Sequence, residues 1–137
     1  MGERTAQRAL EGLLRAEVSV RRRIAQQDEG LSNSAWSVLV LLREAGGESE
    51  QRALRERLGT SKANVSEVLS TLERGGLIVR RPLKRDRRAC AAALTSVGQA
   101  LVERLLPLHE RRVELAFAAL DLEEQRALAQ LCGKLAA

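Results

Sequence analysis

The sequence predicts a mainly α-helical fold of about six helices with a small β-hairpin wing, and a few observations carry this prediction. Two short amphipathic segments, 49–58 and 62–74, are joined by a tight turn containing Gly59, which is the helix-turn-helix pattern. Two strand-length segments, 77–80 and 91–94, follow directly. A helix-turn-helix followed by a hairpin is a winged helix-turn-helix, a DNA-binding architecture.

The two ends of the chain are predicted to be helical because their apolar residues recur at helical spacing. The segment 3–27 is predicted to be one long helix that the sequence DEG at 28–30 ends, and its apolar stripe comprises Ala6, Leu10, Leu13, Leu14, Val18 and Ile24. Another helix is predicted to begin at Thr95, a good N-cap residue, and to reach about Ala119. The last helix follows Asp121, which forms a capping-box pattern with Glu124, and its stripe comprises Leu122, Leu128, Leu131 and Leu135.

The segment after residue 33 is apolar on nearly every side and is predicted to be a central, buried helix. Ser34 is its expected N-cap and Gly46-Gly47 its expected end. The strand prediction at 91–94 depends on context, because alanine has poor strand propensity.

The positive charge of the chain is concentrated in its central third. The net charge is +5, with 23 Lys and Arg against 18 Asp and Glu. Residues 51–94 hold eleven of these cations and four of the acids, a local balance of +7, so the rest of the chain carries −2. Such a patch attracts polyanions.

The densest part of this patch is RRPLKRDRR at 80–88, in which six cations surround Asp86. A surface loop exposed to water is the simplest interpretation of such a run. At the tip of a wing, however, these cations are expected to reach a DNA minor groove, where arginine responds to groove shape. Asp86 is expected to form a salt bridge that orients one neighbouring arginine.

The motifs LERGGLIVR, DRR and LTSVGQAL resemble those of the MarR family of bacterial transcription regulators, and the similarity extends over about residues 31–106. The resemblance implies a single domain, 1–137, that works as a homodimer. The winged helix-turn-helix lobe would comprise 31–94. The segments 1–29 and 95–137 would interlock as the helical dimerisation region.

The resemblance also implies a regulator that binds double-stranded DNA at a pseudo-palindromic operator. It would repress its own or neighbouring genes and be released by a small aromatic or phenolic ligand. Asn pairs well with adenine and Lys with guanine, whereas hydroxyls at a helix N-terminus suit phosphate. The expected DNA-binding residues are Thr60, Ser61, Lys62, Ala63, Asn64, Ser66, Ser70, Arg80, Lys84, Arg85, Asp86, Arg87 and Arg88.

Four further residues have a functional and a structural interpretation. Trp36 either contacts the ligand or packs in the core, and Cys90 either senses oxidants beside Arg88 or is a small strand residue. Cys132 is expected to pack at an interface. His109 is the only histidine, which argues against a zinc site, and no metal or other cofactor is expected.

A winged-helix module that binds an acidic protein remains an alternative, as does a thiol-based regulator that uses Cys90. An enzyme is the least favoured class, because the sequence shows no nucleophile–base arrangement and no glycine-rich phosphate loop. No apolar run approaches the roughly 20 residues of a membrane span. Two cysteines without a CxxC motif, and no signal-peptide pattern at the start, lead us to expect a cytoplasmic protein.

Overall fold

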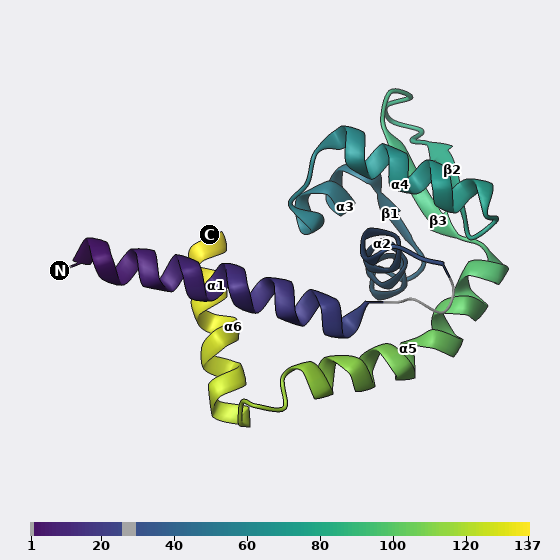
Figure 1. Ribbon diagram of the computed structural model, residues 1–137. Coiled ribbons are helices and arrows are strands. Elements are labelled where there is room, and N and C mark those ends of the chain that lie inside the picture. Colours follow the sequence, from purple (N-terminus) through teal and green to yellow (C-terminus); the bar gives the residue numbers. More distant parts are fainter. Residues whose placement is uncertain (1, 26–29) are drawn as a thin grey trace. The chain divides into compact units, whose positions relative to one another are not determined.

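The computed structural model describes residues 2–25 and 30–137, and these residues form six helices and three strands (Figure 1). The chain divides into two compact units: Gln26–Pro107, and Met1–Ala25 together with Leu108–Ala137. We call the first the winged unit and the second the terminal unit. The mainly helical fold with a small wing is confirmed.

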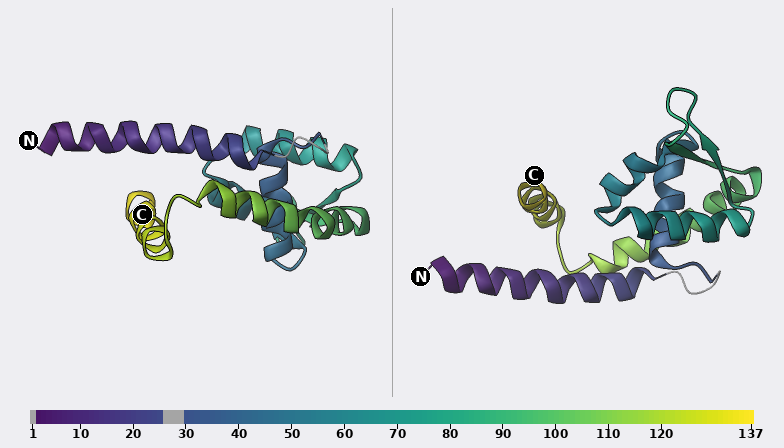
Figure 2. Two further views of the ribbon diagram at one scale, coloured as in Figure 1. Left: turned by 60° about the horizontal axis from the view of Figure 1, so that its bottom comes forward. Right: turned by 90° about the horizontal axis from the view of Figure 1, so that it is seen from above.

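The winged unit contains the helix-turn-helix and the sheet. Its elements in chain order are α2 (Asn33–Glu44), β1 (Glu48–Glu50), α3 (Gln51–Leu58), α4 (Lys62–Arg74), β2 (Ile78–Pro82), β3 (Cys90–Leu94) and the part of α5 (Ser96–Ala116) before Pro107. The loop between β2 and β3 projects away from the helices of this unit in the views of Figures 1 and 2. The tip of the wing therefore extends beyond these helices.

The core of the winged unit is built around α2, as the apolar character of this segment predicts. α2 packs against α3, α4 and β3. The buried cluster comprises Ala35, Trp36, Val38, Leu39, Leu42, Leu54, Val65, Leu69, Leu72, Ile78, Ala92, Val102 and Leu105. The prediction that Ser34 caps α2 is wrong: Ser32 is the N-cap, and its Oγ accepts a hydrogen bond from the backbone N–H of Ala35 at 3.1 Å. The hydroxyl that caps the first turn of α2 therefore lies two residues before the predicted one.

The predicted hairpin is part of a three-stranded antiparallel sheet with the order β1-β3-β2. The helix predicted at 49–58 begins instead at Gln51, because Glu48–Glu50 is extended and pairs with β3, where Ser49 lies opposite Ala92. On the other side of β3, Arg80 lies opposite the same alanine. A strand of three residues was too short to be recognised in the sequence, and it pairs with the edge of β3 that β2 does not occupy.

The alanine-rich strand β3 is confirmed in spite of its poor propensity, because it lies at the centre of the sheet. Ala91, Ala92 and Ala93 are buried there. Their short side chains allow α2 to pack closely on the strand. Pro82 ends β2, which is an edge strand, and an edge is where a residue without a backbone N–H is tolerated.

The terminal unit consists of α1 (Gly2–Ile24), the part of α5 after Pro107 and α6 (Leu122–Ala136). The predicted capping box is present: Asp121 Oδ1 accepts from the Glu124 N–H at 2.9 Å, and Glu124 Oε1 accepts from the Asp121 N–H at 3.0 Å. Neither α1 nor α6 has a buried residue. The first helix was predicted to end at residue 27, and the sequence DEG that breaks it was predicted to begin at residue 28. Both positions lie outside the described residues.

Candidate nucleic-acid interface

The first turn of α4 is presented to solvent by a tight turn after α3. Gly59 ends α3 in the left-handed conformation, with φ +64°, which a glycine adopts without steric cost. Ser61 then caps α4, and its Oγ accepts from the Asn64 N–H at 3.1 Å. The Asn64 amide nitrogen also donates to Thr60 Oγ1 at 3.1 Å, which holds this side chain in place.

The residues expected to read bases differ in exposure. Ser61, Lys62, Ala63 and Asn64 are exposed, whereas Ser66 and Ser70 are half-buried. The Ser70 hydroxyl donates to the Ser66 carbonyl at 2.9 Å and accepts from the Arg80 guanidinium at 3.0 Å. Ser70 is therefore engaged within the protein, and the exposed members of the expected base-reading set lie at the start of α4.

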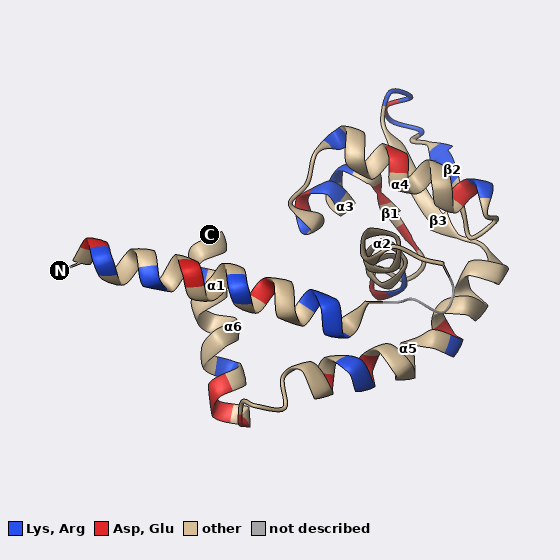
Figure 3. Cartoon of the chain, viewed as in Figure 1, with Lys and Arg blue, Asp and Glu red and all other residues tan. Residues whose placement is uncertain are grey.

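The wing loop, residues 83–89, is closed by its own backbone. The Leu83 N–H donates to the Ala89 carbonyl, and the Ala89 N–H donates to the Asp86 carbonyl, each at 3.0 Å. Lys84, Arg85, Asp86, Arg87 and Arg88 are all exposed. Figure 3 shows the cations of this loop in blue, together with those of α3 and of the start of α4.

The structure corrects the role expected for Asp86. Its carboxylate accepts the backbone N–H of Arg88 at 3.0 Å, which shapes the loop as short acidic side chains do in turns. The acid that holds an arginine of the wing loop is Glu50 on β1, which forms an ion pair with Arg85. These two residues are 35 positions apart, so no local spacing in the sequence indicated the pair.

Arg80, another residue expected to contact DNA, connects the wing to α4. Its guanidinium donates to Glu73 Oε1 at 3.0 Å, and its backbone N–H donates to Glu73 Oε2 at 3.1 Å. The side chain of Arg80 is 25% exposed. The hydrogen bonds from the Arg80 side chain and backbone lower the pKa of the Glu73 carboxyl below its ordinary value of 4.5. Glu73 thus fixes where the wing starts.

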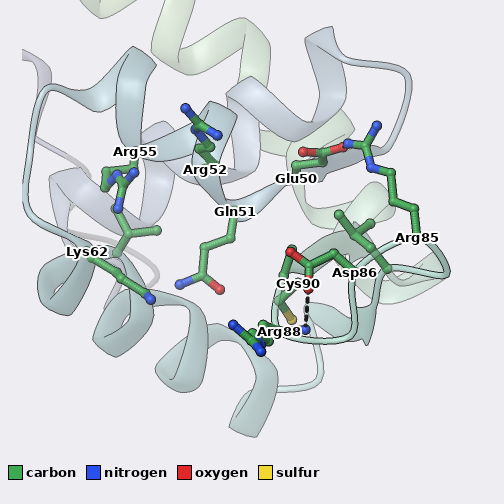
Figure 4. Close-up of a pocket in the computed structure, with 12 residues that line it drawn as sticks. Glu50, Gln51, Arg52, Arg55, Lys62, Arg85, Asp86, Arg88 and Cys90 are labelled. Carbon is green, nitrogen blue, oxygen red and sulfur yellow. Dashed lines mark hydrogen bonds and ion pairs between the residues drawn. The ribbon is translucent and has the colours of Figure 1, made fainter.

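A pocket of about 470 Å³ lies between α3, the first turn of α4 and the wing loop; we call it the wing pocket. It is lined by Glu50, Gln51, Arg52, Arg55, Lys62, Val65, Leu83, Arg85, Asp86, Arg88, Ala89 and Cys90. In Figure 4 the side chains of Gln51, Lys62 and Arg88 extend toward its centre. Sequence reasoning found Lys62 and Arg88 but missed Arg52 and Arg55, because α3 carries no family motif that singles them out.

Comparisons with known proteins assign the family. The sequence model of the MarR family matches residues 29–89. The HTH-type transcriptional regulator YkoM of Bacillus subtilis is 32% identical over 108 residues, which are 79% of this chain and 70% of YkoM. The chain belongs to the MarR family. This MarR-family protein is accordingly a transcriptional regulator that binds DNA, and its fold and relatives are those of regulators rather than enzymes.

Two further relatives of this MarR-family chain have more specific names. The transcriptional repressor MprA of Escherichia coli is 29% identical over 108 residues, which are 78% of this chain and 61% of MprA. A solved structure of BpsR from Bordetella bronchiseptica, described as regulated in its DNA binding by 6-hydroxynicotinic acid, superposes with a TM-score of 0.85. It is 25% identical and the match covers 95% of this chain and 99% of BpsR.

The remaining candidate residues of this MarR-family chain are dispersed. Trp36 is 3% exposed within the core cluster, a position that favours packing over ligand contact. Cys90 is half-buried in the wing pocket and Cys132 is exposed on α6; an oxidant-sensing role for Cys90 stays a prediction. Burial, together with the Arg112 charge, lowers the pKa of His109 below its ordinary value of 6.5, against the opposing effect of Glu110.

Metal clusters and membrane-spanning helices are both absent from the described part of the chain. Residues 2–25 and 30–137 contain no group of three or more His, Cys, Asp or Glu side chains that could hold a metal ion. Within the same residues, no helix is both long and apolar enough to cross a membrane.

Proposed function

We propose that this MarR-family regulator is a cytoplasmic, dimeric repressor that inserts α4 into the major groove and the wing loop into the adjacent minor groove. The observation that carries this proposal is the joint exposure of the first turn of α4 and of a loop with four cations, both in one compact unit. Recognition helices act through their N-terminal residues, and arginine suits a narrow minor groove.

Lys62 and Asn64 are the proposed base-reading residues. Lys pairs with the acceptor edge of guanine and Asn with the donor and acceptor of adenine. An amide nitrogen carries two hydrogens. One of these bonds Thr60 and fixes the Asn64 side chain, so the other remains for a base together with the carbonyl oxygen. The exposed hydroxyl of Ser61 and the N-terminus of α4 suit a phosphate.

The wing cations are proposed to divide into two groups. Arg80 positions the wing through Glu73, whereas Lys84, Arg87 and Arg88 contact DNA directly. Arg85 is 73% exposed beside Glu50, so a phosphate can replace this carboxylate when DNA is bound.

A homodimer is proposed from the apolar surface of the terminal unit. The large apolar residues exposed there are Leu10, Leu13, Leu14, Val18, Leu108, Leu115, Leu122, Leu128, Leu131 and Leu135. Large apolar residues gathered on an exposed surface are typical of protein–protein interfaces. A symmetric pair would place two α4 helices about 34–36 Å apart, one turn of DNA, and would favour a pseudo-palindromic operator.

Repression of transcription, and its relief by a small molecule, are proposed from the descriptions of two relatives. MprA is named a repressor, and BpsR is described as controlled by 6-hydroxynicotinic acid, a small aromatic acid. A dimer on an operator blocks transcription by occupying the promoter. A small aromatic or phenolic effector would then act by lowering the affinity of the protein for DNA. To do so, the effector must bind the free protein more tightly than it binds the DNA-bound protein.

The test is DNA binding by Arg88→Ala, with Arg126→Ala on α6 as a control that removes the same charge from the terminal unit. A footprint on the DNA upstream of the coding sequence defines the operator, and fluorescence anisotropy measures its affinity. We expect Arg88→Ala to weaken binding about 10- to 100-fold with an unchanged circular dichroism spectrum. Wild-type affinity in this variant would remove the wing from the mechanism, and a footprint that never forms would favour an acidic protein partner instead.

A further inference from the structure

The side of α4 that faces away from the core carries an acidic residue, Glu67. The helix buries Val65, Leu69 and Leu72. Successive residues of an α-helix are about 100° apart, so Glu67, two positions after Val65 and two before Leu69, lies about 160° from both. Its side chain is exposed, on the face of α4 that the proposed function directs at DNA.

Glu67 has no cation beside it on the helix. Side chains three or four positions apart on an α-helix are neighbours, and an acid on a helix surface gains stability from a cation at this spacing. The neighbours of Glu67 at this spacing are Ala63, Asn64, Ser70 and Thr71. The Glu67 carboxylate forms no hydrogen bond or ion pair with residues 2–25 or 30–137. Both of its oxygens therefore remain free to accept hydrogen bonds.

The hydroxyls of the following turn are engaged within the helix. Ser70 donates to the Ser66 carbonyl at 2.9 Å, and Thr71 donates to the Glu67 carbonyl at 3.1 Å. A hydroxyl has a single proton, so neither has one left for a base. In the second turn of α4, residues 66–69, Glu67 is the one exposed residue. Its carboxylate is therefore the group that this turn offers to a base edge.

A carboxylate on a DNA-binding surface opposes binding unless it finds a hydrogen-bond donor, because phosphates repel it and it can only accept hydrogen bonds. In the major groove guanine and thymine present acceptors, whereas cytosine presents a donor, its N4 amino group. Adenine also has an amino group, but its N7 acceptor lies beside that group and repels the second carboxylate oxygen. Cytosine is therefore the base that a glutamate at this position favours.

We propose that Glu67 is a specificity-determining residue of this regulator and reads cytosine through its N4 amino group. This role rests on the proposed function, in which Lys62 and Asn64 bring α4 into the major groove. Glu67 lies about one helical turn beyond these two residues, so it contacts a different base pair. It acts largely by exclusion, because any other base leaves the carboxylate facing acceptors without a partner.

The test is a selection of binding sites by the purified protein from double-stranded DNA of randomised sequence. For the wild type we expect cytosine at one position of each half-site. Glu67→Gln should change this preference to adenine, because glutamine pairs with the N6 and N7 atoms of adenine. Glu67→Ala should show no preference at this position, while the rest of the selected sequence stays the same.

Fluorescence anisotropy measures the same effect as affinity. Replacing the selected cytosine should weaken wild-type binding about 10-fold and leave the binding of Glu67→Ala nearly unchanged. Non-operator DNA should bind Glu67→Ala more tightly than it binds the wild type, because a charge that repels phosphates is gone. A loss of selectivity together with a gain in general affinity is a result that a damaged helix does not produce.

Glu48→Gln is the matched control, since Glu48 is an exposed glutamate of the same unit but lies on β1, outside the helix-turn-helix. This variant removes the same charge and should keep the base preference of the wild type. If Glu67→Gln and Glu48→Gln gain equal affinity for all DNA and both keep the wild-type preference, Glu67 contributes only its charge and the proposal is wrong.

The selection distinguishes two failures. A wild-type protein that enriches no sequence is not a sequence-specific regulator, and the role of Glu67 fails together with the proposed function. A wild-type protein that enriches a site whose bases are the same in Glu67→Gln and in Glu67→Ala keeps the proposed function, and only the role of Glu67 is refuted.

Discussion

Gly98 in the first turn of α5 shows how one residue determines where two elements meet. The Thr95 N–H donates to the Leu77 carbonyl at 3.1 Å, and the Thr95 hydroxyl donates to the Gly76 carbonyl at 2.6 Å. The same hydroxyl accepts the Gly98 N–H at 3.0 Å, as the N-cap role predicted for Thr95 requires. A Cβ on Gly98 would lie 2.0 Å from the Leu77 carbonyl oxygen, which is backbone and cannot rotate away.

We therefore expect Gly98→Ala to lower the free energy of unfolding by about 1–3 kcal/mol or more, because α5 must move away from the start of β2. Gly133→Ala on α6 is the control: a Cβ there meets nothing within 4 Å, and alanine should raise helix stability by up to about 1 kcal/mol. Thermal unfolding at one protein concentration measures both. A Gly98→Ala protein as stable as the wild type would contradict the close approach.

At this scale the sequence predicted local contacts and missed distant ones. The Asp121–Glu124 capping box was predicted because both residues lie within one helical turn. The salt bridge predicted for Asp86 was wrong, because the acid that pairs with Arg85 is Glu50, on a strand that the sequence did not reveal. Residue spacing contains no information about contacts that only the folded sheet creates.

Among the elements, α4 and β2 are joined by the pair Glu73–Arg80, which sets the position of the wing relative to the proposed base-reading helix. The lowered pKa of Glu73 means that the folded state favours the carboxylate. This contribution to stability is fully present above the ordinary value of 4.5, and it is lost as the pH falls through the lowered pKa.

We expect Glu73→Gln to be less stable than the wild type at neutral pH and to approach it in acid, because the wild type then loses its carboxylate as well. Urea unfolding at pH 7 and at successively lower pH values measures this difference. Glu67→Gln on the same helix is the control, since Glu67 is exposed and its carboxylate forms no hydrogen bond or ion pair with residues 2–25 or 30–137. A difference between Glu73→Gln and wild type that is independent of pH would show that the ion pair is not the cause.

The strand β3 shows why element propensities are a weak guide here. Its three buried alanines favour a helix when taken alone, yet the strand is the centre of the sheet. It was predicted from its place after the basic loop and before Thr95. The third strand, β1, was missed because three residues with two glutamates have no apolar pattern.

For the whole molecule, the exposed leucines of the terminal unit are the surface through which the proposed dimer would form. We expect Leu131→Glu to yield monomers and to weaken operator binding, because a buried, unpaired carboxylate would oppose the interface. Analytical ultracentrifugation and anisotropy measure the two effects. Wild-type protein that sediments as a monomer would refute the dimer outright.

Ala129→Glu is the matched control, because two residues along a helix are about 200° apart and Ala129 therefore lies on the other side of α6. We expect this variant to remain dimeric. Equal dissociation of both variants would mean that charge on α6, rather than loss of the apolar stripe, separates the subunits.

The sequence by itself determined the helical class, the helix-turn-helix, the cationic wing and the family resemblance, because each depends on local periodicity, turn residues or composition. Only the tertiary structure decided that a third strand joins the sheet, that Glu50 and Glu73 engage two of the wing arginines, and that Arg55, Lys62 and Arg88 surround one pocket. The physical reason is that these contacts join residues far apart in the chain. Their geometry exists only after the core around α2 has brought the elements together.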